Sequence, residues 1–432
     1  METIKIGLIG FGTVGTGVLR LLKDNRELIA ERCGGYMDLV RVAAKNLRKK
    51  RVISVGRGVL TRDVMGLLHD PQIQIIVELI GGIHPAKDFI LEAFKNGKDV
   101  VTANKALLAE CGAELFESAK KYGRNLFFEG SVGGGMPVIK SFREGLAGNH
   151  IKAIYGIVNG TSNYILSKMS LEAVDFCQAL QEAQDLGYAE ADPTLDLEGI
   201  DSAHKLTILA SLAYGSWINF KNVYVEGITK ISQIDIGFAR QFGYTVKLLA
   251  IAKEKENSIE ARVHPTLIPS DFLLSSVHGV YNAVYYDGDY VGKGLLYGRG
   301  AGEKPTASAV VSDLIDAMRH LGSKNNGSSW MLTRKVKKIQ PIDDLECRCY
   351  LRFSALDQPG VLAKIAGILS EHKISISSVI QPERHKSGPV PVVIMTHHAK
   401  ESDFKASIQK IDRLTAIKHP TLRIRVEEGE EK

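Results

Sequence analysis

The first third of the chain alternates short apolar runs with stretches whose apolar positions recur every three or four residues. Such runs predict strands, and the longer recurrence predicts helices. Strands are predicted at residues 4–10, 38–44, 73–80, 99–104 and 125–132. Helices are predicted at residues 14–30, near Val64, from Ala86 and from Ala106. Because strand and helix alternate, we expect an α/β domain of residues 1–132 with a parallel sheet covered on both faces.

From Gly133 the pattern changes to that of an α+β domain, which we assign to residues 133–321. A helix is predicted after Pro137, and several more up to about Tyr214. Strands are predicted at residues 151–158, 245–254, 258–268 and 282–298, the last as a hairpin about Asp287-Gly288. A helix near residues 305–320 closes this domain, and we expect it to pack back on the first one.

The last part of the chain predicts a linker and a third domain. Residues 322–346 mix Gly, Ser, Asn and charged residues with little periodicity, which is typical of a linker. Residues 347–432 fit the order strand, helix, strand, strand, helix, strand, which is the ferredoxin-like arrangement. Three domains agree with a length of 432 residues, because one hydrophobic core rarely supports so long a chain.

Composition and charge exclude several classes of function. The net charge of +6 is small for this length, and the acidic tail at residues 427–431 is short, so no nucleic-acid partner is indicated. A strand begins almost immediately after Met1, which leaves no room for a signal peptide, and no apolar run is long enough to span a membrane. The 5 cysteines are odd in number and scattered, so we expect reduced thiols in a cytoplasm. Cys347 and Cys349 would share one strand face, but the sequence pairs no further ligands with them to complete a metal site.

A glycine fingerprint opens the first helix. Gly10, Gly12 and Gly15 follow an apolar strand, in the order that makes a tight turn, admits a pyrophosphate and packs helix on strand. The pyrophosphate would then meet the N–H groups and the positive end of the helix dipole. We therefore interpret the first domain as a Rossmann-type dinucleotide-binding domain.

The end of the second predicted strand indicates which dinucleotide is bound. An acidic residue for the ribose hydroxyls is usual there, but the strand runs into "KNLRKKR" without Asp or Glu. Lys45, Arg48 and Lys49 would attract a 2′-phosphate, so the hypothesis is NADP in preference to NAD, with NAD still possible. A solvated basic loop is the alternative interpretation.

Polar residues gather where other strands end. Lys105 lies at the carboxyl edge of the parallel sheet, where open α/β folds bind ligands. The loop "EGSVGGGMP" is too rich in glycine to pack a core, and its carbonyl groups could hold a monovalent cation or a substrate, or form a plain turn. Asn159-Gly160 ends a strand of the second domain, and Thr161 is predicted to cap the helix that follows.

The stretch from Gly187 to Leu209 places carboxylates before an apolar helix. That helix is apolar on most sides and should be buried, carrying Asp201 and Lys205 four residues apart on the same face. Such a pair beside a cofactor would orient the ammonium as a proton donor, and Lys105 nearby would lower its pKa. Glu190 and Asp196 suit a substrate with an amino group.

Five stretches carry a close and nearly full-length resemblance to the homoserine dehydrogenases, which interconvert aspartate 4-semialdehyde and homoserine in threonine, isoleucine and methionine biosynthesis. They are "GLIGFGTVGTGV", "VVTANKALLA", "GIVNGTSNYIL", "EAQDLGYAEADPTLDLEGIDSAHKLTILA" and "YGRGAGEKPTASAVVSDL". Ser162 stands where the family usually has a second threonine, and the hydroxyl is retained. The resemblance implies an NAD(P)-dependent oxidoreductase that acts on a CH–OH group by direct hydride transfer.

The resemblance also implies roles for individual residues. Lys205 is expected to donate the proton, with Asp201 positioning it and Lys105 as an alternative acid at the nicotinamide. The substrate would be bound by Glu190, Asp196, Asp201 and Thr161. The dinucleotide would touch Gly10, Gly12, Thr13, Val14, Gly15, Lys45, Lys105, Gly187 and Gly302. A structural sodium ion would be held, largely by backbone oxygens, at Glu129, Val132, Gly134 and Met136.

The C-terminal stretch "RFSALDQPGVLAKIAGILSEHKISISSVIQ" resembles the amino-acid-sensing ACT domain. Its turn at Asp357, Pro359 and Gly360 could meet a free amino acid, often at a junction between paired domains, and the family suggests threonine as a feedback inhibitor. A purely architectural, dimerising domain is the alternative. We expect a homo-oligomer formed through the second domain.

Three rival functions stay open at this point. An acylating aldehyde dehydrogenase would need a nucleophilic cysteine with a base, but Cys111 and Cys177 have no obvious histidine partner. A dinucleotide-dependent amino-acid sensor without catalysis would explain the fingerprint and the ACT-like end, but not a buried Asp201 and Lys205. Another ACT-containing hydroxy-acid dehydrogenase would use arginine and histidine, for which His204 is a poor candidate.

Overall fold

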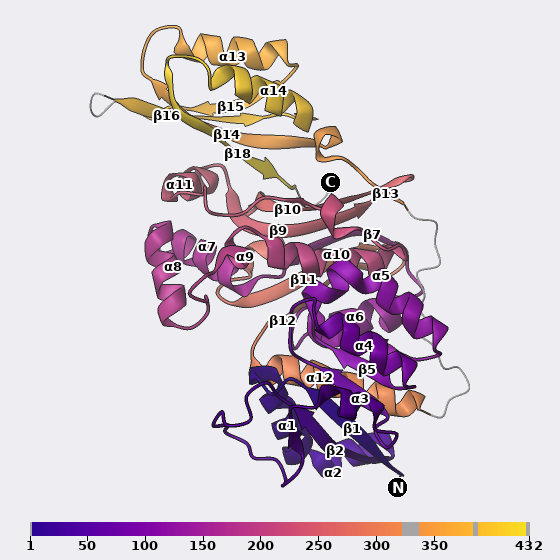
Figure 1. Cartoon of the computed structure of the whole chain (residues 1–432). Coiled ribbons are helices and arrows are strands. Elements are labelled where there is room, and N and C mark those ends of the chain that lie inside the picture. The colour runs from indigo at the N-terminus through magenta and orange to yellow at the C-terminus, as the bar shows by residue number, and fades with distance from the viewer. Residues whose placement is uncertain (1, 322–336, 383–387, 429–432) are drawn as a thin grey trace.

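The computed structural model describes residues 2–321, 337–382 and 388–428. Figure 1 shows these residues as an elongated molecule, with the N-terminal sheet at one end and the C-terminal domain at the other. Residues 322–336 of the predicted linker and residues 429–432 lie outside the described part. In the described part, each helix lacks the length or the apolar character needed to cross a membrane.

The N-terminal sheet is parallel and has the order β3-β2-β1-β4-β5-β6. Its strands are β1 (Glu2–Ile9), β2 (Gly35–Ala43), β3 (Leu60–Thr61), β4 (Ile75–Glu78), β5 (Asp99–Thr102) and β6 (Leu126–Phe127). Its helices are α1 (Thr13–Asp24), α2 (Arg26–Cys33), α3 (Val64–His69), α4 (Ala86–Lys95) and α5 (Lys105–Lys121). The order reverses between β1 and β4, and this is the switch point at which such sheets bind ligands.

The helix predicted at residues 14–30 is in fact two helices. Asn25 separates α1 from α2 with φ −111° and ψ 25°, values outside the helical range. Asp24 and Asn25 are poor helix formers, because their side chains compete for backbone hydrogen bonds. The break spans a single residue, so a pattern of apolar positions does not reveal it.

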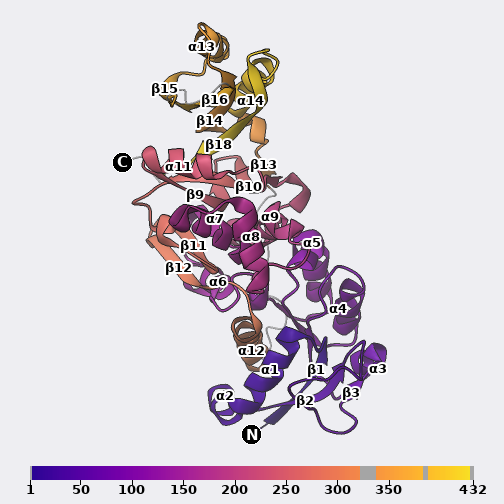
Figure 2. The ribbon, with the colours of Figure 1, turned by 90° about the vertical axis from the view of Figure 1, so that its left-hand side faces the viewer.

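Helix α12 (Glu303–His320) packs on the N-terminal sheet although it follows the second domain in sequence. Its Ala307, Val310 and Leu314 share a hydrophobic core with Ile6 and Leu8 of β1. At Gly17 of α1, a Cβ atom would come within 2.8 Å of the carbonyl oxygen of Glu303, so α1 and α12 approach closely only because this position is glycine. Figure 2 shows α12 beside α1 at the N-terminal end of the molecule.

The second domain contains antiparallel strands in the order β12-β11-β7-β9-β10. The strands are β7 (Ile151–Ile157), β9 (Tyr244–Glu254), β10 (Ser258–Pro269), β11 (Tyr281–Gly288) and β12 (Gly292–Arg299), with the short β8 (Tyr224–Val225) beside β10. The helices are α6 (Val138–Lys140), α7 (Gly160–Glu172), α8 (Phe176–Asp185), α9 (Thr194–Leu197), α10 (Ile200–Tyr214) and α11 (Gln233–Gln241). The hairpin turn lies at residues 289–291, because Gly288 still pairs with Gly292, and the turn predicted about Asp287-Gly288 is therefore displaced.

The C-terminal domain has the order of elements that the sequence predicts. It contains β14 (Glu346–Leu356), α13 (Val361–Glu371), β15 (Ile376–Ile380), β16 (Pro389–Thr396), the short β17 (Ala399–Lys400), α14 (Glu401–Ile411) and β18 (Ile417–Val426). The sheet order β18-β14-β16-β15 is that of a ferredoxin-like fold. In Figure 1, α13 and α14 lie on one side of this sheet.

The second and third domains share one continuous sheet. Strand β18 runs parallel to β10, with Thr266 opposite Arg425 and Leu267 opposite Val426. The stretch predicted as linker also contributes, because β13 (Lys338–Ile339) pairs with β10. The described end of that stretch is therefore part of the sheet rather than a free connection. The fold as a whole is mixed α/β, with a Rossmann-type domain, a mixed-sheet domain and a C-terminal ferredoxin-like domain.

Candidate active site

The glycine loop after β1 forms an open cradle at the start of α1. Gly10 has φ +109°, and a Cβ atom at Gly15 would overlap the carbonyl oxygen of Gly10. At Gly12, by contrast, a Cβ atom would meet nothing within 4 Å. No side chain caps α1, whose N-cap is Gly12 itself. A tight turn, close helix packing and open space over uncapped N–H groups are the three features that a dinucleotide pyrophosphate requires.

A cavity of about 700 Å³ extends from this loop across the switch point. Its wall includes the predicted residues Gly10, Gly12, Lys45 and Lys49. The wall also includes Arg51 and Arg62, which the sequence interpretation did not single out, and none of the described residues that form it is acidic. Arg48, Thr13, Val14, Gly15, Gly187 and Gly302 do not line it.

The basic side chains of this cavity come from two neighbouring strand ends. Lys45 and Lys49 follow β2, and Arg62 follows β3 directly. Arg51 lies over the ring of Phe11, 4.6 Å from its centroid, and donates to the carbonyl of Asn46 at 2.6 Å. Arg62 was missed because it lies outside the basic run, and only the parallel pairing of β2 with β3 brings it to the same edge.

A buried polar network supports the edge of the sheet beneath Lys105. The Thr102 hydroxyl donates to Glu78 at 2.7 Å, and the Asn104 side chain accepts from the Leu107 N–H at 3.2 Å. Asn104 thereby caps α5, of which Lys105 is the first residue. Burial raises the pKa of Glu78 above its ordinary value. The sequence reasoning missed Glu78, because it ends β4 inside a strand pattern of apolar residues.

Asp201 joins the two predicted lysines. Its Oδ1 lies 2.5 Å from the Lys105 ammonium, and its Oδ2 lies 2.6 Å from the Lys205 ammonium. The Asp201 and Lys205 side chains are only 5% and 7% exposed, whereas Lys105 is 43% exposed. Lys205 also donates to the carbonyl of Val158 at 2.5 Å. The cluster is therefore a buried pair with one cation at its open side.

The two amines of this cluster have opposite pKa shifts. Burial lowers the pKa of Lys205; Asp201 opposes this shift, and the charge of Lys105 adds to it. Burial alone would lower the pKa of Lys105, but Asp201, then Asp196 and Glu190, raise it instead. For Asp201, the attraction of both lysines outweighs burial and holds the pKa well below its usual range. Lys205 is accordingly the amine that loses its proton more easily.

The predicted substrate residues lie on the solvent side of this cluster. Asp196 is half-buried and accepts from the Asn159 amide at 2.7 Å, while Glu190 is exposed. Asn159 also donates to Oδ2 of Asp201 at 2.8 Å, so one amide links both carboxylates. The sequence pattern marked Asn159 only as the end of a strand.

The sequence predicted Thr161 as the cap of α7, and this prediction is wrong. The Asn159 side chain is the cap and accepts from the Ser162 N–H at 2.8 Å. The Thr161 hydroxyl instead donates to the carbonyl of Tyr188 at 2.7 Å, which ties α7 to the loop after α8. Its place in the substrate site stays a prediction.

The residues predicted to hold sodium follow β6. The buried carboxylate of Glu129 accepts the N–H groups of Ile139 at 2.9 Å and of Lys140 at 2.8 Å. Val132, Gly134 and Met136 are also buried, and the Met136 carbonyl accepts the N–H of Val138. The Glu129 carboxylate thus serves the start of α6, so a cation here would depend on backbone oxygens. The sodium ion stays a prediction.

Cys347 and Cys349 share one buried face of β14, with their sulfur atoms 3.8 Å apart. Glu401 lies 4.0 Å from Cys347, a third group that the sequence did not indicate. The same glutamate pairs with Arg423 and Arg425, at 2.6 Å and 2.5 Å. Its charge is therefore already matched without a metal ion.

Comparisons with known proteins agree with this geometry. Residues 137–315 match the family model "Homoserine dehydrogenase", residues 10–129 match "Homoserine dehydrogenase, NAD binding domain", and residues 350–416 match "ACT domain". A homoserine dehydrogenase of Pseudomonas aeruginosa is 45% identical over 434 residues, covering 99% of this chain and 100% of the relative.

Solved structures give the same result. The crystal structure of a homoserine dehydrogenase from Thiobacillus denitrificans superposes with a TM-score of 0.93 at 45% identity, covering 99% of both chains. A hyperthermophilic archaeal homoserine dehydrogenase mutant in complex with NADPH superposes with a TM-score of 0.64 at 28% identity, covering 75% of this chain and 99% of the other. The chain therefore belongs to the homoserine dehydrogenase family, oxidoreductases that act on a CH–OH group, and it ends in an ACT domain.

Proposed function

We propose that this chain interconverts L-homoserine and L-aspartate 4-semialdehyde with NADP, and that Lys205 exchanges the proton. The observation that carries this proposal is the Asp201 carboxylate, which holds both lysines at 2.5–2.6 Å where the two domains meet. The bound dinucleotide supplies hydride chemistry, which protein side chains cannot provide. The residues of the chain would orient the substrate, balance its charges and exchange the proton.

Lys205 meets the requirements of a general acid and base. In reduction of the aldehyde its ammonium would protonate the developing alkoxide, and in oxidation its neutral amine would accept the hydroxyl proton. Because burial lowers its pKa, the neutral form is reached more easily than in a solvated lysine. Asp201 would be a positioning residue, and Asp196 and Glu190 would face the amino group of the substrate. Lys105, with its raised pKa, would stay charged and bind the substrate or the nicotinamide end of the cofactor.

The preference for NADP is supported by the charge of the cavity wall. Lys45, Lys49, Arg51 and Arg62 converge where the adenosine ribose would lie, and the part of the cavity wall that the structure describes has no carboxylate. A 2′-phosphate would gain charge-assisted hydrogen bonds there, whereas a bare 2′-hydroxyl would find no acceptor of the usual kind.

The proposal extends to regulation and assembly. The ACT domain would bind a free amino acid, with threonine expected, and inhibit synthesis of threonine, isoleucine and methionine precursors. At the edge of the second sheet, β12 exposes Leu295 and Tyr297, and a second copy of the chain would cover these apolar groups. A sodium ion held by the carbonyl groups of residues 132–136 would stabilise the junction of the first two domains. All 5 cysteines are free thiols, which suits the expected cytoplasmic setting.

The test is NADP reduction on addition of L-homoserine at alkaline pH, followed by nicotinamide absorbance. Lys205→Met should lower kcat by about 10²–10⁴-fold, the usual contribution of a general acid or base. Lys98→Met is the matched control, because Lys98 is an equally buried lysine whose partners are the carbonyls of Asp70 and Ile73. Full turnover in Lys205→Met would transfer the role to Lys105, and no turnover with any hydroxy substrate would favour a sensor without catalysis.

A further inference from the structure

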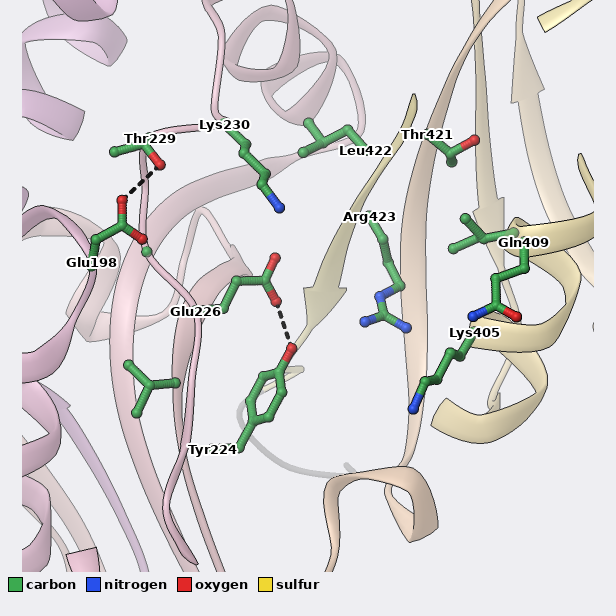
Figure 3. Close-up of a pocket in the computed structure, with 13 residues that line it drawn as sticks. Glu198, Tyr224, Glu226, Thr229, Lys230, Lys405, Gln409, Thr421, Leu422 and Arg423 are labelled. Atoms are coloured by element: carbon green, nitrogen blue, oxygen red, sulfur yellow. Dashed lines mark hydrogen bonds between the residues drawn. The ribbon is translucent and has the colours of Figure 1, made fainter. Parts of the chain in front are cut away.

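A second cavity lies between the ACT domain and the second domain. It has a volume of about 480 Å³ and is separate from the dinucleotide cavity, with which it shares no residue. Figure 3 shows Glu226, Tyr224 and Lys230 on one wall, from the second domain, and Arg423, Lys405 and Gln409 on the other, from the ACT domain. The two domains therefore enclose it jointly.

The charges that face the cavity have both signs and retain bonding capacity. The Glu226 carboxylate accepts from Tyr224 at 3.0 Å and from Arg425 at 2.9 Å, and both bonds use Oε2. Its Oε1 is thus available to a cation. Arg423 pairs with Glu401 through Nη2 alone, at 2.6 Å. Lys230 is exposed at the cavity rim, and Figure 3 shows its ammonium turned toward Glu226 and Arg423.

These groups fit a small zwitterion better than a simple anion. A carboxylate ligand would meet Lys230 and Arg423, which form charge-assisted hydrogen bonds. The same ligand would also lie close to the Glu226 carboxylate, which repels an anion and is a good acceptor for an ammonium group. Ile408 and Leu422 add apolar surface for a side chain. The volume lies within the range of small-molecule sites and admits an amino acid with its water.

The wall of this cavity is attached to the segment that carries the catalytic cluster. The Ile228 N–H donates to the carbonyl of Leu197 at 2.8 Å, and the Thr229 hydroxyl donates to Glu198 at 3.1 Å. A Cβ atom at Gly227 would overlap the Leu197 carbonyl, so the two segments are in close contact. Leu197 follows Asp196 directly, and α10 with Asp201 begins three residues later.

We propose that this cavity binds a free α-amino acid, with its ammonium on Glu226 and its carboxylate on Lys230 and Arg423, and that occupancy alters the homoserine site through residues 196–201. The site differs from the turn at residues 357–360, where the resemblance to ACT domains would locate an effector. The inference gives a binding site for the amino-acid regulation in the proposed function, and it rests on that function only for its rate measurement.

The experiment measures binding of each L-amino acid to the full-length chain by calorimetry. At least one should bind, and its N-acetyl derivative and its amide should bind at least about tenfold more weakly, because each lacks one charged hydrogen bond. Lys230→Gln should raise the Kd by on the order of tenfold, and Gln409→Trp, which fills the cavity from α14, should raise it further. Lys418→Gln, an exposed lysine of β18 outside the cavity, is the matched control.

The same amino acid should change KM or kcat for homoserine, while all three variants keep the parental rate without it. Binding that fails with Asp357→Asn but not with Lys230→Gln would move the site to the ACT turn and overturn the inference. Binding of inorganic phosphate or AMP with equal affinity would identify an anion site instead. No binding of any amino acid would also overturn it, and the homoserine-dependent rate without effector separates that result from a failure of the proposed function.

Discussion

Asp201 is a buried carboxylate with two charged partners, Lys105 and Lys205. Its carboxylate is shared by the Lys205 ammonium, which lies inside the protein, and the Lys105 ammonium, which lies at the surface. Such sharing separates the pKa values of like groups, and pairs of titratable groups with opposite shifts commonly divide the acid and base roles of a site. The division between Lys205 and Lys105 can be tested by removing one charge.

Lys105→Met should move the pH profile of homoserine oxidation to higher pH. The positive charge of Lys105 lowers the pKa of Lys205, and without it Asp201 would attract the Lys205 proton alone, so the neutral amine needed for oxidation would form at higher pH. The measurement is kcat/KM for homoserine across the alkaline range. Lys120→Met, an exposed lysine of the same helix, should leave the profile unchanged. An acid shift in Lys105→Met would contradict the assignment.

Lys247 is a buried amine without a charged partner, since it is only 1% exposed and has no carboxylate beside it. Its ammonium meets the Val277 carbonyl at 2.5 Å and the Asn163 amide oxygen at 3.2 Å. Burial lowers its pKa to about 7. Between this value and about 10.4 the unfolded chain binds the extra proton, so stability should rise with pH across that interval and be lost as pH falls through 7.

Lys247→Met should therefore raise the free energy of unfolding, by a few kcal/mol at about pH 7 and by less than about 1 kcal/mol at about pH 10. The Val277 carbonyl keeps a donor in the variant, because the Asn163 amide also reaches it, at 3.2 Å. Denaturant unfolding at both pH values measures the difference. An equal gain at the two pH values would show that packing, and not ionisation, is the cause.

At the scale of elements, the ends of parallel strands collect the chemistry. Strands β2 and β3 bring Lys45, Lys49 and Arg62 to one edge, and β4 and β5 bring Glu78 and Asn104 to the next. Parallel strands end at the same edge of a sheet, so residues far apart in sequence meet there without any local signal. The basic residues at the first edge lead to a prediction about the choice between NADP and NAD.

Arg62→Ala and Lys49→Ala should each raise KM for NADP by about tenfold, and leave KM for NAD nearly unchanged, because each removes a charged partner of a 2′-phosphate. Arg48 belongs to the same basic run but does not line the cavity. Arg48→Ala should therefore have the same KM values for both cofactors as the parent enzyme. Initial rates at varied cofactor concentration provide the measurement. An equal effect on both cofactors would assign these residues to the shared pyrophosphate instead.

Local patterns predicted much of the fold, and long-range contacts account for what they missed. The alternation of strand and helix, the glycine turn and the Asp201–Lys205 spacing depend on neighbours within a few residues, so the sequence indicates them directly. The bond from Asp201 to Lys105 joins two domains, and Arg62 reaches its cavity only through strand pairing. The prediction of Thr161 as the cap of α7 was wrong because Asn159 and Thr161 are both good capping residues, and the backbone geometry selects Asn159.

At the scale of the whole molecule, buried ion pairs join the ACT domain to the second domain where β10 meets β18. Arg262 contacts both Glu427 and Glu260, and Glu427 also accepts from Lys253 at 2.8 Å. Burial would raise the pKa of Glu427, but Arg262 and Lys253 hold it at about 2. In the described part of the chain two residue pairs connect the strands themselves, and this network lies beside them.

Glu427→Gln should lower the free energy of unfolding by about 3–5 kcal/mol, because the buried Arg262 would keep only the more distant carboxylate of Glu260 to balance its charge. Glu428→Gln removes the neighbouring carboxylate, which is 41% exposed, and should change stability by less than about 1 kcal/mol. Thermal unfolding of the two variants measures the contrast. A similar small loss in both would show that the strands, and not the charges, hold the domains together.

The position of α12 has a consequence for how the protein is made. The sheet of β1 to β6 leaves the ribosome early, but the helix that covers one of its faces is encoded after the entire second domain. Until residues 303–320 emerge, Ile6, Leu8 and Phe127 lack their cover, and the nascent chain exposes an apolar face that invites chaperones or aggregation. The dinucleotide-binding domain, although it is translated first, is therefore completed only after the second domain.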